Sequence, residues 1–158
     1  MTLHHVGIAL GAMIFSAPII NGSAPAVPSD ATSTNHVAAT ELVATLSPVG
    51  SSRIAGSVSF KPGKDSSQIN ATIEIRGASL DEQHPWQIRN GRCGESNPAI
   101  EGAVAMYRKL SVRADGTANI RQTLTTAMPN PATQSVTVSQ SPNDIDVIVA
   151  CGNLSVNK

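Results

Sequence analysis

Hydrophobic and polar residues alternate with a period of two over most of the chain. The segment Ile69–Arg76 shows this most clearly, because apolar and polar residues alternate there without exception, as a half-buried antiparallel strand requires. Similar short patterns predict seven further strands, at residues 40–46, 53–60, 86–89, 110–113, 117–124, 135–140 and 147–150. No stretch has a convincing helical period. About eight short antiparallel strands predict an all-β fold, a β-sandwich or flattened barrel.

Clusters of Gly, Pro, Asn and Asp separate the predicted strands, at residues 47–50, 61–65, 114–116 and 129–131. The pair Asp115-Gly116 stands between two of those strands. An Asp-Gly pair in this position is a strong signal for a hairpin turn. We therefore expect the segments 110–113 and 117–124 to form a hairpin.

Residues 1–26 have the pattern of a signal peptide. An apolar stretch from Val6 to Ile20 precedes Ala24-Pro25-Ala26, which has the small-x-small pattern of a cleavage site, so we expect cleavage after Ala26. The alternative is a membrane anchor, although the stretch is shorter than the roughly 20 residues that a spanning helix needs. We expect a secreted or periplasmic protein with no stable membrane span once the signal is removed.

The remainder of the chain divides into a lead-in and one domain. Residues 27–38 are rich in Pro, Ser, Thr and Ala without an apolar period, and we interpret them as flexible. Residues 39–158 are enough for one domain with one core. The formal net charge is zero, so nothing global points to nucleic acid. The only two cysteines, Cys93 and Cys151, suggest one disulfide in an exported chain.

Two segments resemble a known family. HPWQIRNGRCG (residues 84–94) and VIVACGNL (residues 147–154) resemble the copper-ligand strand and the C-terminal cysteine strand of copper/zinc superoxide dismutases. The likeness is closest to a short exported bacterial subfamily. VTVSQSP (residues 136–142) resembles a further ligand strand of that family. The resemblance covers roughly residues 41–154 and implies a Greek-key, superoxide dismutase-like β-sandwich.

The chain departs from this family where the family binds copper. Gln87 and Arg89 stand at two positions that the family fills with histidine, Ser139 stands at a third, and His84 matches the histidine that opens the motif. The region 90–106 contains no histidine, so the zinc loop has no counterpart. Glutamine is a poor ligand for redox copper, and arginine keeps its proton. We therefore expect no metal, no cofactor and no classical dismutase activity.

If the strands pair as in the family, Gln87, Arg89 and Ser139 converge on one face. One interpretation is a solvated sheet face on which Arg89 pairs with a carboxylate such as Glu74. The other is a remnant pocket that binds an anion or a partner through Arg89. The neighbouring Trp86 is expected in the core.

The sequence predicts a non-catalytic binding or structural protein of the cell envelope. The alternative is a superoxide dismutase or metal-binding protein with an atypical ligand set. The expected partner is an unidentified protein or an anionic ligand, and a homodimer stays open. Nucleic acid is not expected, because no aromatic residues interleave with the basic ones. We interpret His84 as a hydrogen-bonded structural residue.

Overall fold

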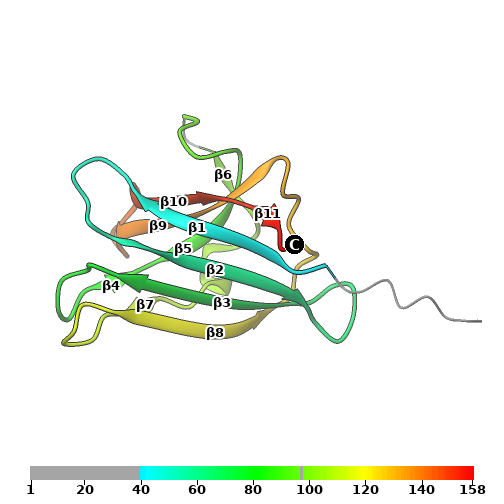
Figure 1. Cartoon of the computed structure of the whole chain (residues 1–158), viewed down its shortest axis with the longest axis horizontal. Coiled ribbons are helices and arrows are strands. Elements are labelled where there is room, and N and C mark those ends of the chain that lie inside the picture. The colour runs from blue at the N-terminus through cyan, green and yellow to red at the C-terminus, as the bar shows by residue number, and fades with distance from the viewer. Residues whose placement is uncertain (1–39, 97) are drawn as a thin grey trace, which may run out of the picture. The chain divides into compact units, whose positions relative to one another are not determined.

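The computed structural model describes residues 40–96 and 98–158, which form an all-β fold (Figure 1). The predicted signal peptide (1–26), its cleavage after Ala26 and the lead-in (27–38) lie outside these residues. The strands are β1 (Leu42–Pro48), β2 (Ala55–Pro62), β3 (Ile69–Arg76), β4 (Gln83–His84), β5 (Trp86–Asn90), β6 (Ala99–Ile100), β7 (Leu110–Ser111), β8 (Ala118–Leu124), β9 (Gln134–Ser141), β10 (Asp144–Asn153) and β11 (Ser155–Val156). A short 3-10 helix, η1 (Val104–Met106), lies between β6 and β7.

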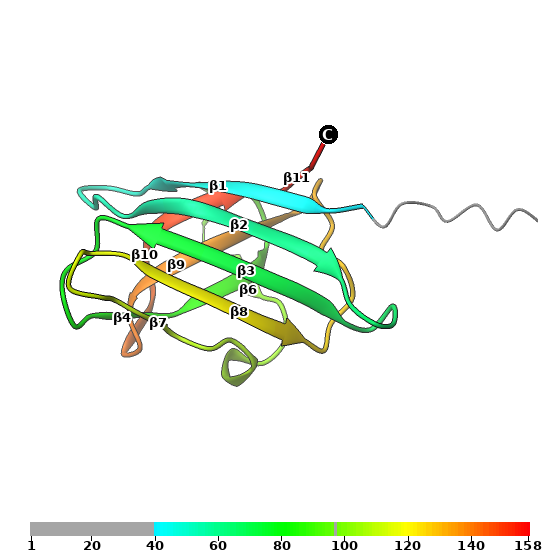
Figure 2. The same ribbon diagram turned by 60° about the horizontal axis from the view of Figure 1, so that its bottom comes forward.

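Eight of these strands form a curled antiparallel sheet in the order β6-β5-β9-β10-β1-β2-β3-β8. The short β11 pairs with β1, and β4 pairs with β7 in a separate two-stranded sheet. Figure 2 shows β1, β2, β3 and β8 in front of β9 and β10. One half of the sheet consists of β1, β2, β3 and β8, and the other half of β6, β5, β9 and β10. The strand β1 joins the two halves, because most of it pairs with β2 while Ser47 and Pro48 pair with β10. Since β3 pairs with β8 and β5 pairs with β9, the chain crosses between the halves. This is the predicted sandwich or flattened barrel.

The hydrophobic core lies between the two halves of the sheet. The alternation in β3 has the predicted consequence, since all its apolar residues are buried and its polar residues are not. Trp86 is fully buried, with its ring centroid 6.3 Å from that of Phe60 and 4.9 Å from that of Tyr107. Burying a large apolar side chain contributes about 1.5–3 kcal/mol to stability. These aromatic contacts hold β5 against the opposite half of the sheet.

Each of the eight predicted strands is present, with ends that differ by a few residues. The strands β4, β6 and β11 were not predicted, because two residues are too few to show an alternation. The Asp115-Gly116 turn forms, with Gly116 at φ 75° and its N–H donating to the Arg113 carbonyl at 2.9 Å. The expected hairpin is nevertheless incomplete, because β7 pairs with β4 and not with β8. A turn signal shows where the chain reverses but not how far the pairing continues.

A disulfide joins Cys93 to Cys151, as predicted, with the Cα atoms 5.8 Å apart. The Cys93 N–H also donates to the Asn153 side chain at 2.9 Å, so the loop after β5 is attached to β10 at two points. Each cysteine is followed by a glycine, and glycine is favoured at the two positions for different reasons. Gly94 has φ 92°, which side chains rarely adopt, whereas a Cβ atom on Gly152 would lie 2.5 Å from the backbone oxygen of Thr45.

Candidate functional site

The strands β5 and β9 are buried on both faces. In their register Gln87 lies opposite Thr137 and Arg89 lies opposite Ser135, so their polar side chains share the face that points away from the core. The exposed fractions of Gln87 and Arg89 are only 0% and 2%. The prediction that this face is exposed to solvent is therefore wrong. Alternation shows which residues share a face, but it does not show which other segments cover that face.

The Arg89 guanidinium is held by the protein's own oxygen atoms. It donates four hydrogen bonds, from Nε to Thr137 Oγ1 at 3.2 Å, from Nη1 to the Pro98 carbonyl at 3.0 Å, and from Nη2 to Gln87 Oε1 at 3.1 Å and the Ile145 carbonyl at 2.9 Å. Hydrogen bonds from a charged donor are about twice as strong as neutral ones. They offset the cost of removing the guanidinium from water.

The structure brings Gln87, Arg89 and Ser139 together. The Ser139 hydroxyl donates to the Ile145 carbonyl at 2.7 Å, and the same oxygen accepts a hydrogen bond from Arg89. Ile145 lies in β10 where the register with β9 shifts between Asp144 and Ile148. The convergence therefore depends on a β-bulge as well as on the pairing of β5 with β9.

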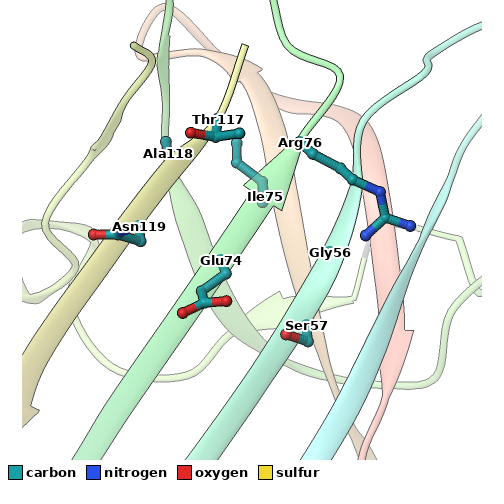
Figure 3. A pocket seen from close by; sticks show the side chains of 8 residues that line it. All are labelled: Gly56, Ser57, Glu74, Ile75, Arg76, Thr117, Ala118 and Asn119. Carbon is teal, nitrogen blue, oxygen red and sulfur yellow. The ribbon is translucent and has the colours of Figure 1, made fainter. Parts of the chain in front are cut away.

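The carboxylate nearest to Arg89 is that of Asp146, with Oδ1 3.6 Å from Nη2. The expectation that Glu74 pairs with Arg89 is wrong. Glu74 lies on the outer face of the other half of the sheet, where the residues opposite it on the neighbouring strands are Ser57 and Asn119. Figure 3 shows these three side chains side by side along a shallow hollow over β2, β3 and β8. This distance is too long for a hydrogen bond, and the Asp146 side chain is 74% exposed, so the ion pair contributes little to stability.

The residues at this site do not fit a copper or zinc ion. The Gln87 oxygen and the Arg89 guanidinium bind each other, and the Ser139 hydroxyl is bonded to Ile145. A guanidinium has only donors and stays charged. Nowhere among residues 40–96 and 98–158 do three or more His, Cys, Asp or Glu side chains gather so that they could hold a metal.

Arg89 is also not accessible to an external anion. Its side chain is 3% exposed, and its hydrogen bonds go to Gln87, Thr137 and two backbone carbonyls. The expected remnant pocket does not open onto this guanidinium. An anion would need a different set of donors.

His84 connects β4 to β9. Its Nδ1 lies 3.0 Å from the Ser139 carbonyl and its Nε2 lies 3.1 Å from Glu82 Oε2, while the residue is 2% exposed. The ring is a hydrogen-bonded part of the fold.

The sequence interpretation missed the two residues that contribute backbone oxygens, Pro98 and Ile145. No side-chain pattern could have indicated them, since any residue carries a carbonyl.

No family model matches the sequence, and no curated protein matches it. In the part of the chain that the structure describes, no helix is long and apolar enough to cross a membrane. The likeness to copper/zinc superoxide dismutases therefore depends on the motifs in residues 84–94, 136–142 and 147–154.

Proposed function

We propose that this protein is an exported, superoxide dismutase-like β-sandwich without a copper/zinc site, and that it is a non-catalytic binding or structural protein of the cell envelope. The observation that carries the proposal is the buried guanidinium of Arg89, which donates four hydrogen bonds to oxygen atoms of the protein. It lies at a position where the resemblance would place a metal-binding histidine.

Electrostatics favours this proposal over a metal centre with an atypical ligand set. At about 4 Å from a guanidinium, a divalent ion would be repelled by roughly 8 kcal/mol at an effective dielectric constant of about 20. This is a large part of the roughly 10–16 kcal/mol by which zinc binds to a complete structural site. Gln87 and Ser139 cannot make up the difference, because both are hydrogen-bonded within the protein.

The guanidinium has a structural use in this arrangement. Through Pro98 it holds the loop after β5, and through Ile145 it holds the bulged part of β10. We infer that Arg89 fixes these segments over β5 and β9, so that the domain needs no ion at this point.

Export is supported by two independent features. The Cys93–Cys151 disulfide is typical of proteins that fold in an oxidising compartment. The apolar leader and the small-x-small pattern at Ala24-Pro25-Ala26 point in the same direction.

The test is metal loading of the protein purified after export. We would incubate it with excess Cu²⁺ and Zn²⁺, dialyse it against a weak chelator, and measure bound metal and superoxide consumption. The expected result is far less than one equivalent of metal and no catalytic consumption. Stoichiometric metal with superoxide turnover, both lost in the double variant Gln87→Ala with Ser139→Ala, would refute the proposal.

A further inference from the structure

The outer face of β2, β3 and β8 carries two adjoining hollows. The first, shown in Figure 3, has a volume of about 310 Å³ and includes Arg76 in its lining. The second has a volume of about 400 Å³ and includes Arg108 and Arg121. Glu74 and Asn119 line both hollows, so the two adjoin along β3 and β8. Together they extend over one polar face of the sheet.

Positive charge predominates at these hollows. Three arginines line them, against one carboxylate among the described residues, that of Glu74. A fourth arginine reaches their edge, because Arg113 Nη2 donates to Asn119 Oδ1 at 3.2 Å. Asp115 lies in the same turn as Arg113, so four arginines face two carboxylates and leave an excess of positive charge. We call the four arginines the arginine face: Arg76, Arg108, Arg113 and Arg121.

The arginine face is exposed and is not neutralised by the protein itself. All four residues are exposed. The ion pairs found among residues 40–96 and 98–158 involve Lys61, His84 and Arg89, and none of these four arginines. Figure 3 shows the carboxylate of Glu74 and the guanidinium of Arg76 directed away from each other. Since the whole chain has a formal net charge of zero, this face is a local concentration of positive charge that would attract anions.

The spacing of the charges selects the kind of anion. Thr72, Glu74 and Arg76 share one side of β3, and Arg121 lies opposite Thr72. Arg76 and Arg121 are therefore about 13 Å apart along the strands, too far for one small anion to contact both. Glu74 lies midway between them, where it would repel a negative group. The pattern fits an extended ligand whose anionic groups are separated by an uncharged unit.

The groups between the arginines indicate that the uncharged unit carries hydroxyl groups. Ser57, Thr72, Glu74 and Asn119 offer hydroxyl, carboxylate and amide groups, which can all form hydrogen bonds with a hydroxyl. Among the described residues, no exposed large apolar side chain lines either hollow. The face therefore lacks the apolar groups that insert into a membrane surface or form the centre of a protein interface.

We propose that the arginine face binds a linear acidic polysaccharide in which sugars with a carboxylate alternate with neutral sugars. Arg76 and Arg121 bind separate carboxylates, and a guanidinium can hold a carboxylate through two parallel hydrogen bonds. Glu74 and Asn119 bind hydroxyl groups of the sugars between them. This inference rests on the proposed binding function and names its partner class.

The experiment measures binding of a hyaluronan hexasaccharide, in which glucuronate alternates with N-acetylglucosamine. The protein purified after export is added to the end-labelled oligosaccharide, and fluorescence anisotropy is recorded. We expect saturable binding that weakens in salt, because raising the salt from about 0.1 M to about 1 M shortens the screening length from about 10 Å to about 3 Å. The neutral hexamer of N-acetylglucosamine should bind at least tenfold more weakly, which corresponds to about 1.4 kcal/mol or more. Equal binding of the two oligosaccharides, or no saturable binding of hyaluronan, would overturn the proposal.

The decisive variant combines Arg76→Gln with Arg121→Gln, and we expect it to lower the affinity for the hexasaccharide at least tenfold. The matched control combines Arg92→Gln with Lys158→Gln, which removes the same charge from the loop after β5 and from the last residue of the chain. Its affinity should change less than twofold. All four residues are exposed, so both variants should fold. An equal loss in the two variants would mean that only net charge matters, and would refute the site.

A second variant, Glu74→Gln, tests the spacing of the charges. Linear polyphosphate, which carries a charge on every unit, is the comparison ligand. Because the variant removes the central negative charge, its affinity for polyphosphate relative to the hexasaccharide should rise at least threefold. An unchanged ratio would overturn the proposed alternation. Metal retention in the preceding test would instead refute the proposed function, so the two failures are distinguishable.

Discussion

The Nη2 atom of Arg89 lies 2.9 Å from the carbonyl oxygen of Ile145. This carbonyl belongs to the part of β10 where the register with β9 shifts, and it also accepts the hydroxyl proton of Ser139. A carbonyl oxygen has two lone pairs and can accept both bonds. One backbone oxygen of β10 therefore connects side chains from β5 and β9.

Replacement of Arg89 by methionine should destabilise the fold. In Arg89→Met the carbonyl of Pro98 and the side-chain oxygen of Gln87 lose their donor while they stay largely buried. We expect the free energy of unfolding to fall by about 3 kcal/mol, since unsatisfied buried groups cost about 1–3 kcal/mol each and some are rehydrated. Urea denaturation measures this change.

The matched control is Arg121→Met in β8, because Arg121 is exposed. Its effect should stay within about 0.5 kcal/mol, as is usual for surface substitutions. Equal effects of the two substitutions would contradict the structural role of Arg89.

The sequence predicted the strands well because each strand leaves a side-chain signal. In β3 the alternation from Ile69 to Arg76 gave both ends of the strand. In β5 it gave the strand and the core position of Trp86, but the polar outer face suggested contact with solvent. Whether that face is covered depends on the positions of the loop after β5, which carries Pro98, and of the part of β10 that carries Ile145.

The other features near the candidate site also divide into those that the sequence predicts and those that it does not. The disulfide could be predicted, because Cys93 and Cys151 are the only cysteines and both stand in recognisable motifs. The approach of Asp146 to Arg89 could not, since Asp146 lies in the part of β10 where the register with β9 shifts. Tertiary contacts of this kind have no local pattern.

Loss of the disulfide should lower stability by several kcal/mol. The bond closes a loop between residues 58 positions apart, which the chain-entropy model values at about 4 kcal/mol. We expect Cys151→Ser to melt at a clearly lower temperature than the unsubstituted protein under oxidising conditions. After reduction with dithiothreitol, the unsubstituted protein should melt close to the variant. An unchanged melting temperature of Cys151→Ser would show that the bond contributes little.

Three histidines should create metal affinity where the resemblance places the ligands. The variant with Gln87→His, Arg89→His and Ser139→His removes the guanidinium and supplies imidazoles, which suit copper and zinc. We expect at least weak binding of Zn²⁺ by isothermal titration calorimetry. The control keeps Arg89 and carries only Gln87→His and Ser139→His. It should bind no metal, because the guanidinium repels the ion. A folded triple variant without uptake would show that the three positions do not converge as the structure has them.

The single tyrosine should make stability fall at alkaline pH. Burial raises the pKa of Tyr107 from 10.0 to about 12, and the Glu101 carboxylate adds to this effect. Between these values the unfolded chain releases the proton and the folded protein keeps it. The contribution to stability is therefore complete below pH 10 and is lost as the pH rises toward 12. Since Tyr107 is the only tyrosine, tyrosinate absorbance reports on it alone. The Tyr107→Phe variant should show a weaker loss of stability over this range, and a midpoint near 10 in the folded protein would contradict the burial of the hydroxyl.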